Sequence, residues 1–405
     1  MGHLFPMSAL LTELRDRGHD IALRTLAAGV ETGLGLGFAT AAVDPRIEAI
    51  PLEDADAPNP RVALKTALSA FARHAEYEVT DLAAAIDEVR PDVVIVDANC
   101  WGAAAGAEAS ELPWLSFWPF VPYLRSRGVP PWGPGLRPLP GLLGRARDAL
   151  VRPRVTGVFD NAMVGSLNRI RARIGVPTIT SADDYGRRAP LKLVATAQPF
   201  EYPHPDWDDS IALIGACAFD PTPQETPEWL AAIDWPIVLV STSSEFQGDT
   251  DLGRTALDAL ADEPVHVVVT FPAGVPPWFR TPANATVCQF APHGLVLDHA
   301  VCAITHGGMG TTQKALARGV PVCVVPHGRD QFEVARRVEV ARCGTRLPAN
   351  NLTATQLRDK VRQAMTMADG ARRVAAGYAA TGGTAHGADL IEQRLLTQPR
   401  TPTTR

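Results

Sequence analysis

Cysteine is scarce in this sequence, and its spacing excludes two kinds of small protein module. The chain of 405 residues contains six cysteines, and none forms a C-x-x-C pair or a Cys/His cluster with metal-binding spacing. A disulfide framework and a zinc module are therefore excluded. Cys302 and Cys323 lie in apolar, strand-like runs, where we expect small buried side chains in a reducing cytoplasm.

Long apolar runs and excess positive charge are also absent. No stretch approaches the roughly 18 unbroken apolar residues of a transmembrane helix. Acidic Glu13 closely follows the short apolar stretch 9–11, so no secretory signal is expected. Only four of the 38 basic residues are lysine, and the net charge of −6 argues against a general nucleic-acid binder. We expect a cytoplasmic protein without stable membrane insertion.

The length predicts two domains of alternating strands and helices, because one ordinary core does not support 405 residues. A segment rich in Pro, Asp and Trp, 198–236, separates two stretches of such alternation. We predict an α/β protein with two similar halves around a cleft. The predicted parts are an N-terminal domain at 1–200, a linker at 201–235, a C-terminal domain at 236–375 and a last helix at 376–396.

Apolar periodicity and the positions of Gly and Pro predict the individual elements. Helices are predicted at 7–17, 63–89, 101–110, 160–174, 252–261, 313–318, 353–367, 370–379 and 384–396. Strands are predicted at 19–26, 92–96, 112–117, 191–195, 211–215, 237–241, 265–270, 285–290, 300–304 and 320–325. The G-x-G-x-G spacing at 33–37 predicts a loop, and 397–405 is predicted to be disordered. No strand precedes the first helix, so we expect the natural start to lie upstream of Met1.

A glycine-rich turn at 305–312 (THGGMGTT) marks the predicted functional centre of the chain. A strand precedes the turn, and a helix and a second strand follow it. Glycines at a helix start leave backbone N–H groups uncovered and let a ligand approach the main chain closely. The positive end of the helix dipole adds to this effect, so the turn predicts a phosphate or diphosphate site.

Residues on both sides of this turn complete a longer pattern. The sequence 290–331 resembles the donor signature of the UDP-glycosyltransferase-like superfamily of inverting glycosyltransferases with the GT-B fold. The signature reads aromatic-x-P-Q/H, then H-x-G-x-G/N-S/T, then D/E-Q. The matching residues are Phe290, Pro292, His293, His306, Gly308, Gly310, Thr311, Asp330 and Gln331. The resemblance implies two Rossmann-like domains facing across a cleft, with the last helix packing back on the first domain.

The residue types fit the roles that the resemblance implies. Phe290 offers a π-face to a uracil or thymine base, and the backbone of Ala291 could pair with the base edge. His306 and the amides of Gly310 and Thr311 would hold the diphosphate as its charge grows. The expected donor site also contains Gly308, His293 and Ser244, together with Asp330 and Gln331 for the sugar hydroxyls. Ser243 stands where the family usually has glycine.

Lys314 departs from the family pattern. The family places Glu eight residues after the motif histidine, where it binds the ribose hydroxyls, and here that position is Lys314. A lysine donates hydrogen bonds and accepts none. Three interpretations stay open: the ribose is held in another way, Lys314 meets a phosphate, or Lys314 is a solvated helix lysine.

The N-terminal sequence Gly2-His3-Leu4-Phe5-Pro6 fits the G-H-x-x-P pattern that, in the resembling family, places a general base in the cleft. Histidine suits that task because its pKa lies near neutral. Asp97, at the end of the predicted strand 92–96, is the expected carboxylate partner of His3. The alternatives are a frayed terminal histidine and, for Asp97, a cap of the next helix.

A segment dense in proline and aromatic residues, 114–140, predicts a long irregular loop. Exposed aromatic side chains on such a loop would line an acceptor site, and we expect Trp118, Phe120 and Trp132 to do so. The alternative is a hydrophobic hairpin packed on the domain.

Together these features predict a metal-independent, inverting glycosyltransferase. It would move a hexose or deoxyhexose from a UDP- or dTDP-sugar to a hydroxyl of a bulky apolar natural product, lipid or sterol. We expect no metal, no cofactor besides the nucleotide sugar, no nucleic-acid partner, and a monomer or homodimer. The alternatives are another GT-B enzyme, such as a nucleotide-sugar epimerase or a lipid-linked-sugar transferase, and a non-catalytic nucleotide-sugar-binding helper.

Overall fold

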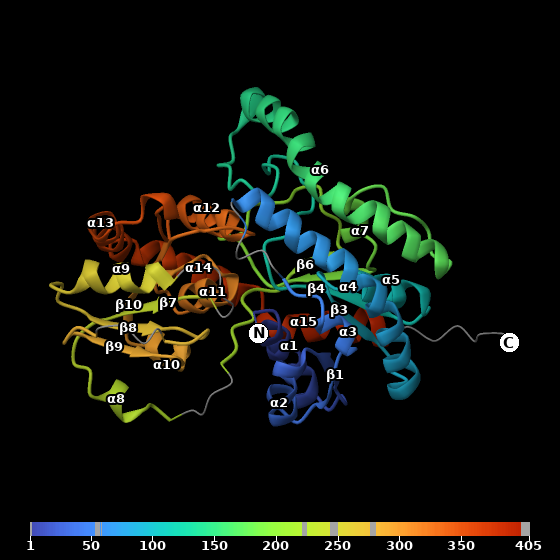
Figure 1. The fold of residues 1–405 in the computed structure, drawn as a ribbon, viewed down its shortest axis with the longest axis horizontal. Coiled ribbons are helices and arrows are strands. Elements are labelled where there is room, and N and C mark those ends of the chain that lie inside the picture. The colour runs from blue at the N-terminus through green and yellow to red at the C-terminus, as the bar shows by residue number, and fades with distance from the viewer. Residues whose placement is uncertain are drawn as a thin grey trace.

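The computed structural model describes residues 2–52, 57, 59–220, 225–243, 250–275 and 281–397, and it contains two main parallel sheets side by side (Figure 1). The sheet of the C-terminal half has the order β12-β11-β10-β7-β8-β9. Its strands are β7 (Ile237–Ser241), β8 (His266–Thr270), β9 (Ala285–Cys288), β10 (Ala300–Thr305), β11 (Val322–Val324) and β12 (Gly344–Arg346). In this order the later strands lie on the far side of β7, as in a doubly wound Rossmann sheet.

Helices cover both faces of this sheet because its strands are apolar on both faces. Val238 and Val240 pack against α9 (Thr250–Leu260) and α13 (Ala354–Met365) on one face. Ile237 and Leu239 belong to the core on the other face. The helices of that second core are α10 (His293–Leu297), α11 (Met309–Ala317), α12 (Gln331–Ala341) and α14 (Ala368–Ala380). The short helices α8 (Glu228–Ala231) and η1 (Ala349–Asn351) complete this half.

The N-terminal half contains a parallel sheet with the order β3-β4-β5-β6 and a separate parallel pair, β1–β2. These strands are β1 (Ala22–Thr25), β2 (Ala39–Ala42), β3 (Val94–Asp97), β4 (Trp114–Trp118), β5 (Leu191–Val194) and β6 (Ile211–Leu213). Leu115, Phe117 and Leu193 pack on the face that α1 (Leu4–Asp16) covers. The remaining helices are α2 (Ala27–Gly35), α3 (Pro45–Glu48), α4 (Pro60–Val89), α5 (Trp101–Ala109), α6 (Gly141–Arg173) and α7 (Ala182–Gly186).

The last helix, α15 (Gly383–Ile391) with its π-helical end Glu392–Leu396, lies against α1 of the N-terminal half. Ala388 and Ile391 complete the core on that face. Arg17 donates to Asp389 over 2.6 Å and to Glu392 over 3.0 Å. The chain therefore crosses between the halves twice, once after β6 and once between α14 and α15.

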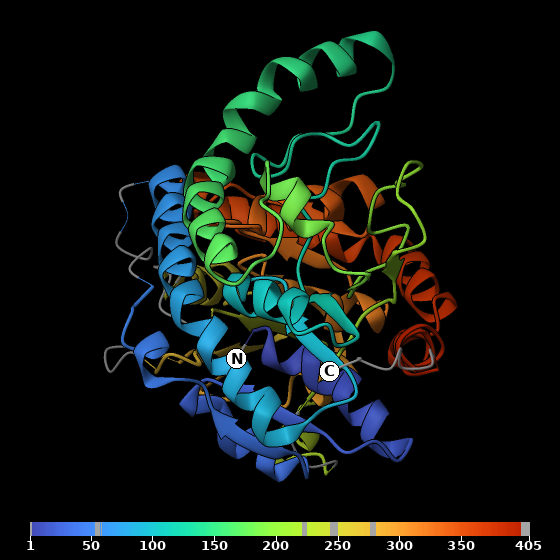
Figure 2. The same ribbon diagram turned by 90° about the vertical axis from the view of Figure 1, so that its right-hand side faces the viewer.

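Two predicted elements were wrong. Of the glycine-rich stretch 33–37, predicted to be a loop, residues 33–35 form the end of α2 and only 36–37 form a turn, because positive φ comes only at Gly37. Helix α6 was predicted to begin at residue 160 and instead begins at Gly141. Pro153 lies inside it, and the missing N–H of a proline usually ends a helix. The first part of α6 projects from the body of the protein (Figure 2), so no buried apolar stripe marks it in the sequence.

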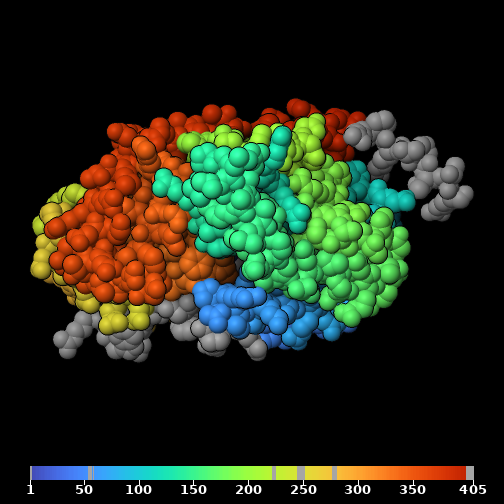
Figure 3. Space-filling model, turned by 90° about the horizontal axis from the view of Figure 1, so that it is seen from above, coloured from blue at the N-terminus to red at the C-terminus, as the bar shows by residue number. Residues whose placement is uncertain are grey.

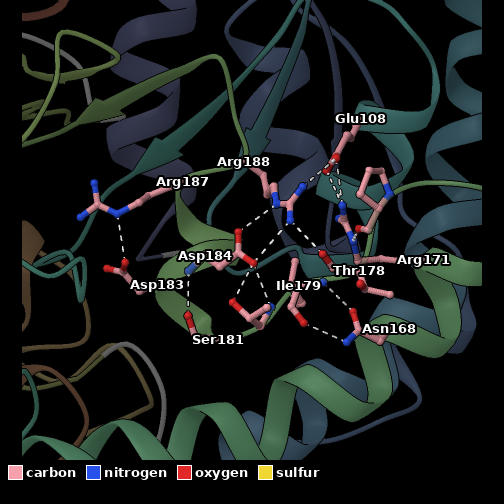
Figure 4. A network of polar contacts seen from close by, with 12 residues as sticks. Glu108, Asn168, Arg171, Thr178, Ile179, Ser181, Asp183, Asp184, Arg187 and Arg188 are labelled. Atoms are coloured by element: carbon pink, nitrogen blue, oxygen red, sulfur yellow. Dashed lines mark hydrogen bonds and ion pairs between the residues drawn. The ribbon is translucent and has the colours of Figure 1, made fainter.

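The second part of α6 is fixed to the body by buried polar contacts (Figure 4). Arg171 is 1% exposed, and its guanidinium donates to both oxygens of Glu108 on α5 over 2.8–2.9 Å. Asn168 exchanges hydrogen bonds with the backbone of Ile179.

Among the described residues no helix combines the length and the apolar character that a membrane crossing requires.

A buried ion network joins the two halves around Arg337 of α12. Its guanidinium donates to Glu201 over 2.7 Å and to Glu333 over 3.0 Å. Glu333 also accepts hydrogen bonds of 2.8 Å from the backbone N–H groups of Gly133 and Gly135. These hydrogen bonds tie the loop before α6 to α12. Figure 3 shows this loop region in contact with the C-terminal half.

The C-terminal part of α14 lies against the backbone of the N-terminal half and of the segment after β6. A Cβ atom added at Gly377 of α14 would lie 2.0 Å from the carbonyl oxygen of Gln198, and one at Gly215 would lie 2.8 Å from that of Tyr378. Only glycine permits these approaches.

We predict that Gly377→Ala lowers the free energy of unfolding by about 1–3 kcal/mol, because the added methyl group must displace backbone. Urea denaturation measures the change. The matched control is Gly157→Ala in α6, where an added Cβ meets nothing within 4 Å. That control is expected to stabilise the helix by up to about 1 kcal/mol. Equal effects of the two substitutions would contradict the close crossing.

Candidate functional site

The topology of the C-terminal sheet places the glycine-rich turn. Strands β7 and β10 are neighbours, and Ser241 pairs in register with Thr305. The strand order reverses between them, and ligands of open parallel sheets bind at the carboxyl ends of the strands at such a point. The turn at 306–308 follows β10 at this position.

The turn has a backbone that only glycine adopts easily. Gly307 has φ of +98°, and a Cβ at Gly308 would lie 2.5 Å from Nε2 of His306. Helix α11 begins at Met309, four residues before the predicted start, so Gly310 and Thr311 belong to its first turn. A Cβ at Gly310 would meet nothing within 4 Å, so the space beside this helix start is open. The arrangement suits an anion.

Side chains from the end of β7, from the turn after β10 and from α11 itself border this helix start. The Oγ atoms of Ser241 and Thr311 lie 3.3 Å apart. His306 Nδ1 lies 3.5 Å from the carbonyl oxygen of Ser241, which leaves Nε2 on the side of Gly308. Ser244, expected at the phosphate, lies outside the described residues.

The segment before α10 presents one exposed ring. Phe290 is 56% exposed, which is unusual for a large apolar side chain and suits a stacking surface. Ala291 is buried. The ring of His293 contacts Thr270 over 3.0 Å, and burial together with the nearby charge of Lys314 lowers its pKa to about 4. His293 is therefore neutral at pH 7.

Asp330 and Gln331 lie at the start of α12. The amide oxygen of Gln331 accepts hydrogen bonds from the backbone N–H groups of His327 (2.7 Å) and Gly328 (3.0 Å). Gln331 thus shapes the preceding loop. Burial raises the pKa of Asp330, and the charge of His3 partly offsets this rise.

His3 and Asp97 are a pair. His3 Nδ1 lies 2.9 Å from Oδ2 and 3.1 Å from Oδ1 of Asp97, although the residues are 94 positions apart. The imidazole of His3 is 41% exposed and stacks on Phe120 with a centroid distance of 5.4 Å. Asp97 also accepts from the N–H of Asn99, while α5 has Cys100 at its N-cap position. Asp97 therefore does not cap α5.

Opposing effects set the pKa of His3. Burial lowers the pKa, but the charge of Asp97, the hydrogen bond to it and the charge of Asp330 raise it above 6.5 overall. The interaction with Asp330 joins the two halves, because Asp330 belongs to the C-terminal half. In Figure 1 the N-terminus lies between the two sheets. His3 is thus near enough to Asp330, at the D-Q end of the donor signature, for the Asp330 charge to affect its pKa.

The aromatic segment is less exposed than predicted. The expectation of exposed rings is wrong for Trp118, which is 1% exposed, and for Phe120, which is also buried. The reason is mutual packing: Trp118 contacts Phe120 and Tyr123, and Trp132 contacts Phe159. The indole N–H of Trp132 donates to Val121. The segment 119–140 is irregular, as its proline content predicts.

Lys314 has a partner that the sequence did not indicate. Its ammonium group donates to Asp220 Oδ1 over 2.6 Å. The interpretation of Lys314 as a solvated helix lysine is therefore wrong. No sequence signal marks Asp220, because it is one of many aspartates in the Pro/Asp-rich segment between the sheets.

A second residue near the site was also missed. Glu78 of α4 accepts the N–H of Gly102 at the start of α5 over 2.7 Å. Burial raises its pKa to about 8, and the charge of Asp97 adds to the rise.

Within the described ranges no group of three or more His, Cys, Asp or Glu side chains could hold a metal ion.

Two Rossmann-like domains with parallel sheets, placed side by side, are the arrangement of the GT-B class of glycosyltransferase folds. Solved structures confirm this fold. The glycosyltransferase of kitacinnamycin superposes with a TM-score of 0.75 at 24% identity, covering 97% of this chain and 96% of that one. CalG4, the calicheamicin glycosyltransferase, gives 0.74 at 21% identity, with 98% and 96% covered.

Sequence comparison identifies the family. Residues 254–386 match the model of the erythromycin biosynthesis protein CIII-like, C-terminal domain. The 4'-demethylrebeccamycin synthase of Lentzea aerocolonigenes is 30% identical over 412 residues, covering 96% of both chains. The oleandomycin glycosyltransferase of Streptomyces antibioticus is 30% identical over 224 residues, covering 53% of this chain and 51% of the relative. The chain belongs to the UDP-glycosyltransferase-like superfamily, and it is a glycosyltransferase related to enzymes of natural-product biosynthesis.

We predict that the His3 ring titrates above pH 6.5. Asp97→Asn should move the midpoint downward, because it removes the negative charge that raises the pKa of His3. NMR of the ring protons measures both midpoints. Because the folded pKa is raised, the pair stabilises the fold at pH below about 6.5, and this contribution is lost as the pH rises through the folded pKa. Asp16→Asn, at the other end of α1, is the control. An unchanged midpoint in Asp97→Asn would contradict the pairing.

Proposed function

We propose that this protein transfers a hexose or deoxyhexose from a UDP- or dTDP-sugar to a hydroxyl group of a bulky apolar acceptor, with inversion and without a metal ion. The observation that carries the proposal is the His3–Asp97 pair, 2.9 Å apart, facing Asp330 of the other half. This pair would place a base opposite the proposed donor site.

The donor would lie along the carboxyl ends of β7 and β10. Phe290 would stack on the pyrimidine, with the backbone of Ala291 at the base edge. The N-terminus of α11, Thr311 and His306 would hold the diphosphate, and this end of a helix stabilises the charge that grows as the bond to the sugar breaks. Asp330 and Gln331 would bind the sugar hydroxyls.

His3 would act as the general base. Its Nδ1 is held by Asp97, so Nε2 takes the proton from the acceptor hydroxyl. The hydroxyl oxygen then forms a bond to the anomeric carbon while the bond from that carbon to the diphosphate oxygen breaks. The electron pair leaves with the nucleoside diphosphate. Asp97 stabilises the imidazolium that forms, as a carboxylate does in other His–Asp pairs.

The acceptor would lie on the N-terminal side of the cleft. Phe120, stacked on His3, and Trp132 are the proposed walls, with Trp118 packed behind Phe120. The names of the relatives, a 4'-demethylrebeccamycin synthase and an oleandomycin glycosyltransferase, support a natural product as the acceptor. An epimerase and a non-catalytic helper are less well supported, because neither requires the His3–Asp97 pair.

We predict that His3→Gln lowers kcat by about 10²–10⁴-fold, the usual contribution of a general base. Nucleotide affinity should stay within a few fold of the parent, because His3 lies on the acceptor side. His19→Gln is a matched control: His19 pairs with Glu392 over 3.0 Å at the contact between α1 and α15. NMR of the product's anomeric carbon tests inversion. A His3→Gln enzyme with parental kcat would refute the assignment of the base.

A second candidate function is favoured by the surface of the projecting part of α6. Leu142, Leu143 and Leu150 are exposed there, and Arg145 and Arg154 lie on the same exposed stretch of helix. A basic, apolar face suits contact with an anionic lipid surface and hence a lipid-borne acceptor.

For this candidate we predict that the protein sediments with phosphatidylglycerol vesicles at low salt and that the Leu142→Ser/Leu143→Ser double variant does not. Val62→Ser, at another exposed apolar position, is the control. Equal sedimentation of parent and double variant, or no binding by the parent, would exclude the membrane-acting candidate.

A further inference from the structure

The pentose of a bound nucleotide must lie between the two ends of the donor site, and this inference rests on the function proposed above. The base would stack on Phe290, and the diphosphate would lie at the start of α11. A pentose connects base and phosphate, so it passes the residues between these places. The charged side chains of this region include Lys314, on the second turn of α11, its partner Asp220 and Arg318, directly after α11.

Lys314 and Asp220 form an enclosed pair. The side chain of Lys314 is only 11% exposed, and that of Asp220 is 26% exposed. The ammonium group lies 5.8 Å from the ring centroid of Phe5, and Phe219, beside Asp220, lies 6.1 Å from the same ring. Phe5 belongs to the same helix as Leu4, the residue after His3. The N-terminal half thus supports the segment that carries Asp220.

The second carboxylate oxygen of Asp220 lies beside the other end of the donor segment. A Cβ at Gly294 would lie 2.3 Å from Asp220 Oδ2 and 2.6 Å from Nη2 of Arg318, so the glycine makes room for the carboxylate and for the guanidinium beside it. Gly294 directly follows His293, whose pKa is affected by the charges of both Lys314 and Asp220. The carboxylate therefore lies between α10 and α11, which are the two helices that border the expected nucleotide.

The chemistry of the pair suits hydroxyl groups better than phosphate. The positive charge of Lys314 is neutralised by the carboxylate of Asp220, so Lys314 offers no unpaired cation to a phosphate. A carboxylate has lone pairs for more than one donor, and Lys314 occupies only Oδ1 in the structure. Hydrogen bonds from hydroxyl groups to a carboxylate are charge-assisted and strong.

We propose that Asp220, held in place by Lys314, accepts hydrogen bonds from the pentose hydroxyls of the nucleotide-sugar donor. Asp220 is then a specificity-determining residue that the segment between the two sheets contributes to the donor site. Lys314 is a positioning residue, because it acts through Asp220.

Calorimetric binding of matched nucleotides tests the proposal. The probes are UDP with 2′,3′-dideoxyuridine diphosphate, and dTDP with 3′-deoxythymidine diphosphate. The parent is expected to bind the hydroxylated member of a pair about tenfold or more tightly, because a site built for a hydroxyl rejects the analogue that lacks it. In Asp220→Asn this preference is expected to fall to less than about threefold.

Two further variants make the result specific. Asp298→Asn is the matched control, because Asp298 forms a salt bridge to the same helix, through Arg318 over 2.9 Å, but is about half exposed. It should keep the parental preference. Lys314→Met keeps the carboxylate but removes its anchor, so an intermediate preference is expected. Melting temperatures verify that each variant is folded, and Lys314→Met alone decides the matter if Asp220→Asn does not fold.

The outcomes separate this proposal from the proposed function. If Asp220→Asn keeps the parental preference for the hydroxylated nucleotide, the role of Asp220 is overturned and the transferase function is untouched. If Asp220→Asn does not fold, a parental preference in Lys314→Met has the same meaning. A parent that shows no preference for the hydroxylated nucleotide also overturns it. A parent that binds neither UDP nor dTDP removes the proposed function and this inference together.

Discussion

The buried charge of Arg337 is the constraint on which the arrangement of the two halves depends. Arg337 is 1% exposed, so its positive charge must be neutralised within the protein. Glu201 and Glu333 do this from the two sides of the junction. Removing one member of such a network leaves the others charged and buried, which is costly. The network thus selects one docking of the halves. Because Glu333 lies in the first turn of α12, that docking also places Asp330 opposite His3.

The proposed chemistry uses this placement. Each half contributes what the other lacks: the N-terminal half supplies the His3–Asp97 pair, and the C-terminal half supplies the open helix start at Gly308. Neither part forms a transferase site alone, because a base must lie within reach of the acceptor hydroxyl while the donor is held in line. The aromatic ring of Phe120 stacks on His3 and limits the positions that the imidazole can take.

The sequence predicted the fold class and much of the candidate site, because spacing within a βα unit fixes which residues reach the ends of parallel strands. His3 and Asp97 were paired correctly because the G-H-x-x-P resemblance indicated His3 and the end of a parallel strand indicated Asp97. Burial of Trp118 was not predictable, because it results from packing with other aromatic residues of the same irregular loop. The start of α6 was missed because its leucines face solvent. Asp220 was missed because only the folded chain brings it to Lys314.

The two adjacent chain crossings limit how the halves can move. Gly215, directly after β6, lies against Tyr378 near the end of α14, so the two connections lie close together at this place. The halves cannot slide past each other here without breaking these contacts. Any change in their docking must also act on the contact between Arg337 and Glu201, because that contact joins the halves too. The donor proposed above would therefore enter between halves that are held together both at the chain crossings and at Arg337.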